Sequence, residues 1–191
     1  MTVDLPTNRL IPTLPLRLNY LLWIEDLLDL SKPNESTTVR GIDIGTGACC
    51  IYPILSARKN NWHFTATETD EINFACSQKT ITENDLLKSI TLIKVTSDSM
   101  LKGNIDLETK HDFTLCNPPF FNSENFGPKS RTEKRPEPVC PKLGGSTSLN
   151  EISFKGGEVE FVSKLINESQ DLRSSIRYDF TFLFFFCNYL H

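Results

Sequence analysis

The sequence predicts an α/β protein whose mainly parallel sheet is doubly wound, with helices on both faces. Strand-like and helix-like segments alternate along the chain, the order that builds parallel strands through right-handed crossovers. A glycine-rich turn directly follows the first strand-like run, where open α/β sheets bind ligands. With 191 residues the chain can bury one core, so we expect a single domain over residues 1–191.

The first segments read as an extended lead-in followed by a helix. Pro6, Pro12 and Pro15 disfavour a helix, and they predict an extended stretch over residues 1–17. Apolar residues then recur at helical spacing, which predicts a helix over Leu18–Leu30.

The middle of the chain alternates between strands and helices. Apolar runs that stop at turns predict strands, and longer amphipathic stretches predict helices. Pro53 is compatible with a helix if it lies in the first turn. In chain order we expect strand Val39–Ile44, helix Cys49–Lys59, strand Trp62–Thr67, helix Asp70–Asn84, strand Ile90–Val95 and strand Phe113–Cys116.

The last third begins with a long polar loop. Pro, Gly and Ser are frequent between residues 122 and 149, which predicts a flexible loop. Gly157–Leu172 carries an apolar stripe and is expected to be a helix, and Tyr178–Tyr189 could be a buried strand. Residues 179–191 form an atypical, phenylalanine-rich tail.

Composition and charge exclude several classes of protein. The formal net charge is −4, so any contact with nucleic acid must rest on a local basic patch. The six cysteines include no C-x-x-C clip, and no His or Cys pair has the spacing of metal ligands, so we expect reduced thiols and no metal. The start lacks the pattern of a signal peptide, and the run Phe180–Cys187 is too short to span a membrane. A cytoplasmic or nuclear protein, with no membrane contact, is the expectation.

The stretch VRGIDIGTGACC indicates a binding site at the carboxyl end of the first strand. Asp43 precedes a Gly-x-Gly turn, and Gly45 and Gly47 let a ligand approach the backbone. The third glycine of the dinucleotide fingerprint is missing. Glu68 ends the second strand, where a carboxylate can accept hydrogen bonds from both hydroxyls of a ribose. This pattern suits S-adenosylmethionine better than NAD, although an ordinary turn and a solvated Glu68 would explain the same residues.

The stretch CNPPFF ends the last strand of the alternating region with an amide and two prolines. The exocyclic amine of adenine is a poor nucleophile because its lone pair is delocalised into the ring. The Asn117 side-chain oxygen and the Pro118 carbonyl can accept hydrogen bonds from that amine and aim its lone pair, while Pro118 and Pro119 stiffen the loop. Phe120 can stack on an unstacked base. The alternative is an Asn-Pro turn followed by core phenylalanines, and Phe121 is interpreted as a core residue.

Several motifs together resemble the methyltransferase-like protein 16 family. They are LIPTLPLRLNYLLWIEDLL, GIDIGTGACCIYPIL, FTATETD, CNPPFF and GGEVEFV, in the same order and spacing. The resemblance implies a Rossmann-like class I fold and S-adenosylmethionine-dependent methylation of adenine-N(6) in RNA. Eukaryotic members modify the U-six small nuclear RNA and hairpins in certain messages, and bacterial relatives methylate large-subunit ribosomal RNA.

The same resemblance implies roles for single residues. Arg17 would meet the carboxylate of the cofactor, Gly45 would lie under the cofactor, and Glu68 would hold its ribose. Cys49, where the family has Ser, would sit beside the cofactor, and Ser99, where the family has Thr, would lie near its adenine. The catalytic tetrad would be Asn117, Pro118, Pro119 and Phe120, and the sequence motifs make Asp43, Gly47 and Asn117 further cofactor-binding candidates.

Two of the regions that depart from the family pattern lie late in the chain. The loop 122–149 differs in sequence but keeps basic residues that could contact RNA, although a solvated loop explains them equally well; they are Lys129, Arg131, Lys134, Arg135 and Lys142. After Tyr178 the pattern stops, and we expect a C-terminally truncated domain with an exposed apolar sheet edge.

The resulting hypothesis is a monomeric RNA adenine-N(6) methyltransferase of the nucleus or cytoplasm that acts on structured RNA. Two alternatives stay open. One is methylation of a glutamine amide in a protein, because NPPY enzymes use the same geometry. The other is a catalytically inactive fragment that binds RNA or cofactor.

Overall fold

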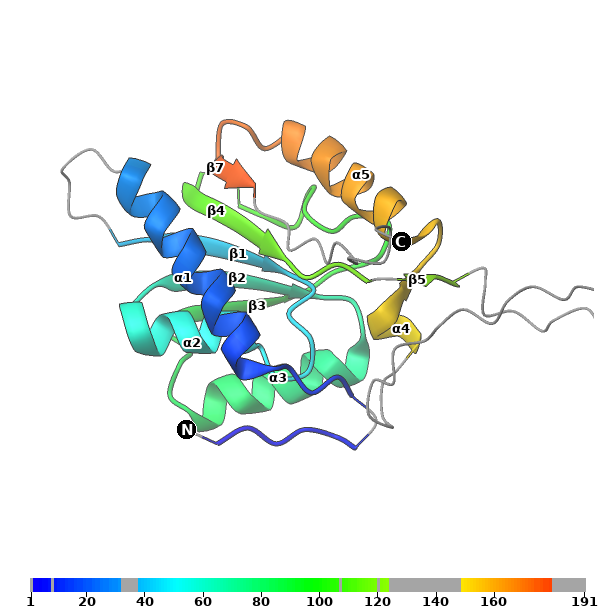
Figure 1. The fold of residues 1–191 in the computed structure, drawn as a ribbon, viewed down its shortest axis with the longest axis horizontal. Helices are drawn as coiled ribbons and strands as arrows, with labels where there is room; N and C mark the ends of the chain where they lie inside the picture. The colour runs from blue at the N-terminus through cyan, green and yellow to red at the C-terminus, as the bar shows by residue number, and fades with distance from the viewer. Residues whose placement is uncertain are drawn as a thin grey trace, which may run out of the picture.

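The computed structural model describes residues 2–7, 9–31, 38–106, 108–119, 121–123 and 149–179 (Figure 1). Its centre is a five-stranded sheet in the order β3-β2-β1-β4-β7, and every neighbouring pair of strands is parallel. This order confirms the predicted doubly wound α/β class. The strands are β1 (Arg40–Ile44), β2 (His63–Glu68), β3 (Ile90–Lys94), β4 (His111–Cys116) and β7 (Ile176–Asp179).

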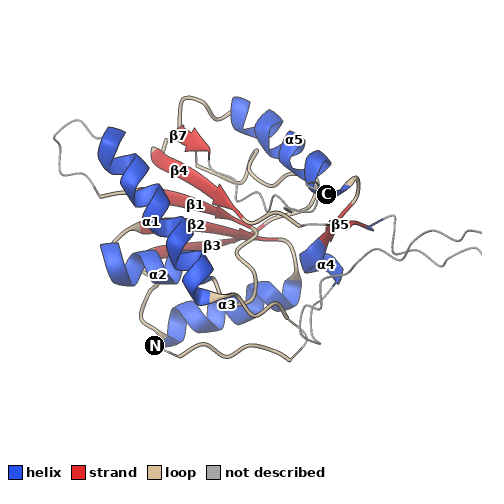
Figure 2. Ribbon diagram, in the orientation of Figure 1, coloured by secondary structure: helices blue, strands red, loops and turns tan. Residues whose placement is uncertain are grey.

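Helices cover both faces of this sheet (Figure 2). On one face, buried side chains of α1 (Leu14–Ser31), α2 (Ile51–Asn60) and α3 (Glu71–Glu83) pack against alternate residues of the strands, among them Phe64, Ala66 and Leu115. On the other face, α5 (Gly157–Gln170) packs against Ile42 and Ile44. The period-two alternation of a strand divides its side chains between these two cores.

The central strand lacks a side chain where two rings meet. A Cβ on Gly41 would lie 2.7 Å from the rings of both Phe64 and Phe113, which pack edge to face with their centroids 5.8 Å apart. Gly41 therefore allows the neighbouring strands to cover the central one with large aromatic side chains.

The first helix begins earlier than the sequence predicts. The lead-in was expected to be extended through residue 17, but α1 starts at Leu14 and includes Pro15 and Arg17. Proline is tolerated in the first turn because the amide that it lacks would have no partner within the helix. The remaining lead-in, up to Thr13, is irregular, as expected.

Three short elements between Pro119 and α5 were not predicted. They are β5 (Phe121–Asn122), α4 (Leu149–Ile152) and β6 (Ser153–Phe154), and β5 pairs with β6 in parallel. The Asn122 Oδ1 also accepts a hydrogen bond from the backbone N–H of Gly156. This small sheet brings the segment that precedes α5 beside the segment that follows β4.

The last described strand differs from the predicted one. The sequence indicated a strand over Tyr178–Tyr189, whereas β7 begins at Ile176, and residues 180–191 lie outside the described part. Within the described ranges, no helix is long and apolar enough to cross a membrane. The same residues include no group of three or more His, Cys, Asp and Glu side chains placed to hold a metal ion.

Candidate active site

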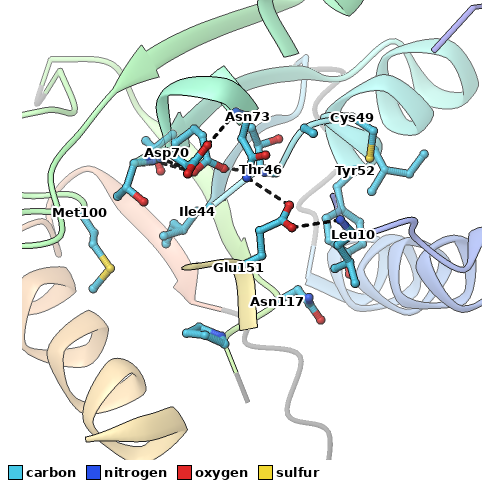
Figure 3. Close-up of a pocket in the computed structure, with 18 of the residues that line it drawn as sticks. Leu10, Ile44, Thr46, Cys49, Tyr52, Asp70, Asn73, Met100, Asn117 and Glu151 are labelled. Atoms are coloured by element: carbon cyan, nitrogen blue, oxygen red, sulfur yellow. Dashed lines mark hydrogen bonds between the residues drawn. The ribbon is translucent and has the colours of Figure 1, made fainter. Parts of the chain in front are cut away.

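A cavity of about 1040 Å³, open solvent at its mouth included, lies at the carboxyl edge of the sheet. Strand ends, the lead-in and the segment before α5 all contribute to it (Figure 3). The predicted residues that line it are Arg17, Gly45, Gly47, Cys49, Glu68, Asn117 and Pro119. Residues that the sequence reasoning did not assign also line it, including Leu10, Tyr52, Asn73, Ser97, Met100, Glu151, Phe154 and Phe161.

The glycine turn is fixed by hydrogen bonds to its backbone. The N–H groups of Gly45 and Thr46 donate to the Thr67 carbonyl, at 3.0 and 2.9 Å. Gly47 donates its N–H to Glu68 Oε2 at 2.8 Å, and its carbonyl accepts from Ser77 Oγ at 2.5 Å. Both glycines have positive φ, +72° and +69°, and a Cβ built on either would meet no heavy atom within 4 Å. The turn therefore presents bare backbone to open space, as a ligand site requires.

Glu68 is a buried carboxylate at the end of β2. Its Oε1 accepts from the N–H groups of Thr69 and Asp70, both at 2.8 Å, in addition to the bond from Gly47 to Oε2. Burial raises the pKa of Glu68, and the three backbone donors oppose that rise. The side chain thus closes the glycine turn onto the start of α3 and also faces the cavity.

Asp43 lies beneath the turn instead of in the cavity wall. It is 1% exposed, it does not line the cavity, and its Oδ2 accepts from Thr46 Oγ1 at 2.6 Å. Burial raises the pKa of Asp43 to about 7, although the hydrogen bond from Thr46 opposes the shift. The prediction of direct ligand contact is corrected to a supporting role, because alternation along β1 directs this residue into the core.

Arg17 connects the first helix to the NPP segment. Its Nη1 donates to Asn117 Oδ1 at 2.7 Å and to the Tyr52 hydroxyl at 2.9 Å, and its guanidinium lies 5.5 Å from the centroid of the Tyr52 ring. Asn117 is half-buried and lines the cavity, and Pro118 is buried behind it. A carboxamide oxygen has two lone pairs, so Asn117 can accept one further hydrogen bond. Phe120 lies outside the described residues.

Cys49 lines the cavity as a buried thiol. It is 5% exposed, and burial raises the pKa of the Cys49 thiol to about 12. It therefore offers a small, neutral wall beside the glycine turn.

Ser99 does not reach the cavity. It borders a separate hollow, where its Oγ donates to the Lys102 carbonyl. Ser97 and Met100 of the same segment line the cavity instead. Glu168 of α5 fixes this segment, since its buried carboxylate accepts from the N–H groups of residues 100 to 102. No local sequence pattern predicts this long-range contact.

Glu151 and Asn73 are polar residues of the cavity that the sequence reasoning missed. Glu151 accepts from the N–H of Leu10 at 3.0 Å and from Asn73 Nδ2 at 3.2 Å. A second contact also joins the lead-in to α3. The buried guanidinium of Arg9 donates to the carboxylate of Asp70 at 3.2 Å, and the same carboxylate caps the N-terminus of α3. The sequence signals that could have identified these two residues were weak: Asn73 lies three residues after the N-cap Asp70, and Glu151 follows the long predicted loop.

The basic candidates Lys129, Arg131, Lys134 and Arg135 lie outside the described residues, as does Lys142.

The arrangement can bind a ligand that carries hydroxyl groups and can orient an amine. Bare backbone and acidic acceptors lie on one side of the cavity, and an amide oxygen with a rigid proline pair lies on the other. The aromatic side chains of Phe154 and Phe161 also line the cavity, and they pack edge to face with their ring centroids 5.2 Å apart.

Comparison with known proteins identifies similar sequences. A family model described as RNA methyltransferase matches residues 1–188. The chain is 44% identical over 182 residues to the RNA N(6)-adenosine-methyltransferase METTL16 of Homo sapiens, a match that covers 93% of this chain and 32% of that protein. It is 35% identical to the U6 small nuclear RNA (adenine-(43)-N(6))-methyltransferase of Drosophila melanogaster, which covers 93% of this chain and 59% of that protein. The chain thus spans about a third of the length of its human relative.

Solved structures of METTL16 domains are similar to this chain in fold as well. The human METTL16 catalytic domain in complex with MAT2A 3′UTR hairpin 1 matches with a TM-score of 0.74 and 42% identity, over 93% of this chain and 59% of that one. The N-terminal domain of human METTL16 in complex with SAH matches with a TM-score of 0.67 and 38% identity, over 94% of this chain and 60% of that one.

Proposed function

Because the chain belongs to this family of RNA methyltransferases, we propose that it transfers a methyl group from S-adenosylmethionine to the exocyclic amine of adenine in structured RNA. One observation carries the proposal. The glycine turn with Glu68 and the NPP segment with Asn117 and Pro119, which are far apart in sequence, meet around a single cavity at the carboxyl edge of the sheet. We also propose that residues 1–191 form one methyltransferase domain and that it acts as a monomer.

The cavity fits the cofactor. Bare backbone at Gly45 and Gly47 allows close approach, Glu68 can accept from the ribose, and Arg17 can pair with a carboxylate. Cys49 would lie beside the ligand, and Ser97 and Met100 would border its base in place of Ser99. When bound, S-adenosylmethionine supplies a methyl group on a sulfonium sulfur, which is electrophilic toward an amine nitrogen.

The NPP segment prepares the amine. The second lone pair of Asn117 Oδ1 and the Pro118 carbonyl would accept the two N–H bonds of the adenine amine, so that its lone pair points into the cavity. Arg17 holds the Asn117 oxygen in place through the hydrogen bond described above. The amine loses one proton to solvent once it carries the methyl group, so no strong base is needed.

The partner that we propose is a hairpin of small nuclear, messenger or ribosomal RNA. Two relatives support this, one named for the U6 small nuclear RNA and one solved with a MAT2A hairpin. Lys129, Arg131, Lys134 and Arg135 remain proposed phosphate contacts, and Phe120 a proposed stacking partner for the base. Such targets imply a nuclear or cytoplasmic location.

A label-transfer assay tests the proposal. The 191-residue chain is incubated with methyl-radiolabelled S-adenosylmethionine and either hairpin RNA or a glutamine-containing protein substrate. We expect label only in RNA, recovered after nuclease digestion as N(6)-methyladenosine. Label in protein would favour the glutamine-amide reaction, and cofactor binding without transfer to either substrate would indicate an inactive fragment.

A further inference from the structure

We propose that the amino edge of the sheet is a second RNA-binding surface, where exposed cations contact the phosphates of an RNA stem whose target adenine lies in the cavity. The cations are Arg40, Lys110, Arg173 and Arg177, and we call them the basic edge. This inference rests on the proposed function, because it names a further part of the RNA that the methyltransferase would bind.

The basic edge is assembled from parts of the chain that are far apart in sequence. Arg40 is the first residue of β1, Lys110 directly precedes β4, Arg177 is the second residue of β7, and Arg173 lies between α5 and β7. These three strands are parallel neighbours, so they begin side by side at the edge opposite the cavity (Figure 1). All four side chains are exposed, and they line one hollow of about 900 Å³, open solvent included.

The charges of the basic edge are not neutralised by carboxylates. Elsewhere on the surface, exposed lysines do form ion pairs, which are Lys59–Glu25, Lys79–Asp4, Lys94–Glu71 and Lys102–Asp171. None of the four cations of the basic edge forms an ion pair within the part of the chain that the structure describes. Lys110 and Arg177 donate to the backbone carbonyls of Ser174 and Ser31, which orients them but leaves their charge uncompensated.

The other titratable groups of the hollow do not cancel this charge. Asp112 is half-buried, and its Oδ2 accepts from the backbone N–H of Arg40 at 2.8 Å. His111 is buried, and burial lowers its pKa, so it adds no charge at neutral pH. Four cations thus surround one carboxylate in a chain whose formal net charge is −4. A local excess of this sign favours a polyanion.

The position of the basic edge sets the length of RNA that can reach it. Strands β1 and β4 are five and six residues long, and a parallel strand rises about 3.3 Å per residue, so the basic edge lies roughly 17–20 Å from the carboxyl edge. A stem of about four base pairs, at roughly 3.4 Å per pair, is shorter than this distance, whereas a stem of about 16 base pairs is longer. The basic edge should therefore contact long stems, through phosphates and without reading their sequence.

The test measures the affinity of the full chain for two hairpins that carry the same target adenine, with stems of about 16 and about four base pairs, as a function of salt. The variant Arg40→Gln/Arg173→Gln removes two phosphate contacts. With the long hairpin, the plot of log affinity against log salt should become shallower by about 1.4–1.8. Between about 50 and 200 mM salt, the unmodified chain should therefore lose roughly tenfold more affinity than the variant. With the short hairpin, the two chains should behave alike, and the affinity for SAH should not change.

Two further variants keep the outcome clear. Lys79→Gln/Lys102→Gln removes the same charge from lysines that are paired with carboxylates, and it should keep the salt dependence of the unmodified chain. Arg173→Gln alone should show about half of the change, and it replaces the double variant if that chain melts before the measurement.

The outcomes separate the two proposals. Equal salt dependence of Arg40→Gln/Arg173→Gln and the unmodified chain on the long hairpin would overturn the inference alone. The same would follow if the Lys79→Gln/Lys102→Gln chain changed as much, since net charge would then explain the effect. Failure of the unmodified chain to methylate either hairpin would overturn the proposed function instead.

Discussion

The two sides of the cavity are held in different ways. The glycine turn is fixed mainly by neighbours in the α/β core, since Glu68, Thr67 and Ser77 bond its backbone from β2 and α3. Asn117 is instead held by Arg17, which lies 100 residues earlier in the chain. The conformation of the turn is thus fixed by the neighbouring strand and helix, whereas the orientation of the Asn117 amide depends on the long side chain of Arg17. Substitutions near the glycine turn should therefore weaken cofactor binding, whereas substitutions that affect Asn117 should lower the rate of methyl transfer.

The largest expected effect separates binding from turnover. Asn117→Ala removes the acceptor for the amine, and we expect the rate of methyl transfer to fall by about 100- to 1000-fold or more, the loss seen when a preorganised hydrogen bond is removed. Cofactor affinity should stay within about tenfold, because the glycine turn is untouched. Single-turnover kinetics and calorimetry measure the two quantities. Asn60→Ala, which loses the hydrogen bond from the last residue of α2 to Glu25 of α1, is the control. Unchanged turnover in Asn117→Ala would contradict the mechanism.

The next effect tests whether one side chain holds the amide. Arg17→Lys cannot reproduce the planar donor that reaches both Tyr52 and Asn117. Turnover should fall by roughly 10- to 100-fold, the cost of a misplaced reacting group. Tyr52→Phe keeps the bond to Asn117 and should lose far less. Equal losses in the two variants would mean that the Arg17–Tyr52 contact, not the bond to Asn117, matters for catalysis.

On the other side of the cavity, Glu68→Ala should damage binding and stability together. It leaves three backbone donors without an acceptor, and the free energy of unfolding should fall by roughly 1–3 kcal/mol in urea titration. Cofactor affinity should fall as well. The neighbouring Glu71 is 86% exposed and pairs with Lys94, so Glu71→Ala should change stability by about 1 kcal/mol or less. A Glu68→Ala chain as stable as the Glu71→Ala chain would show that the turn is not preset by this carboxylate.

The last expected effect concerns the pH dependence of stability. The pKa of Asp43 is raised by burial from 3.8 to about 7, so between these values the folded chain keeps a proton that the unfolded chain releases. Stability from this group is therefore fully present below about pH 4 and is lost as the pH rises to about 7. Asp43→Asn stays neutral, and its melting temperature should decline less over that window, by roughly 3–5 °C for each pH unit, because each pH unit within the window changes the free energy of unfolding by about 1.4 kcal/mol. If the melting temperatures of the two chains declined equally with pH, Asp43 would not be the cause of the pH dependence.

The same contrast explains what could be predicted from sequence. Gly45, Gly47 and Glu68 follow directly from strand ends and turn chemistry, and the structure brings all three to the cavity. Contacts across long sequence separations leave no periodic signal, which is why Tyr52, Asn73 and Glu151 were missed. Ser99 was placed by resemblance, yet the local turn held by Glu168 directs Ser97 and Met100 to the cavity instead. The start of α1 was missed because Pro15 was interpreted as a helix breaker, although it lies in the first turn.

The buried thiol in the cavity wall has a consequence for inhibitor chemistry. Cys49 lies beside the glycine turn, and at first sight it invites a cofactor analogue that carries an acrylamide. Electrophiles of this kind react with thiolates, and burial raises the pKa of the Cys49 thiol to about 12, so the thiol is almost entirely protonated at pH 7. Covalent warheads aimed at this residue would therefore react slowly, and inhibitors of the cavity would have to gain affinity reversibly from the turn, the carboxylates and the aromatic wall.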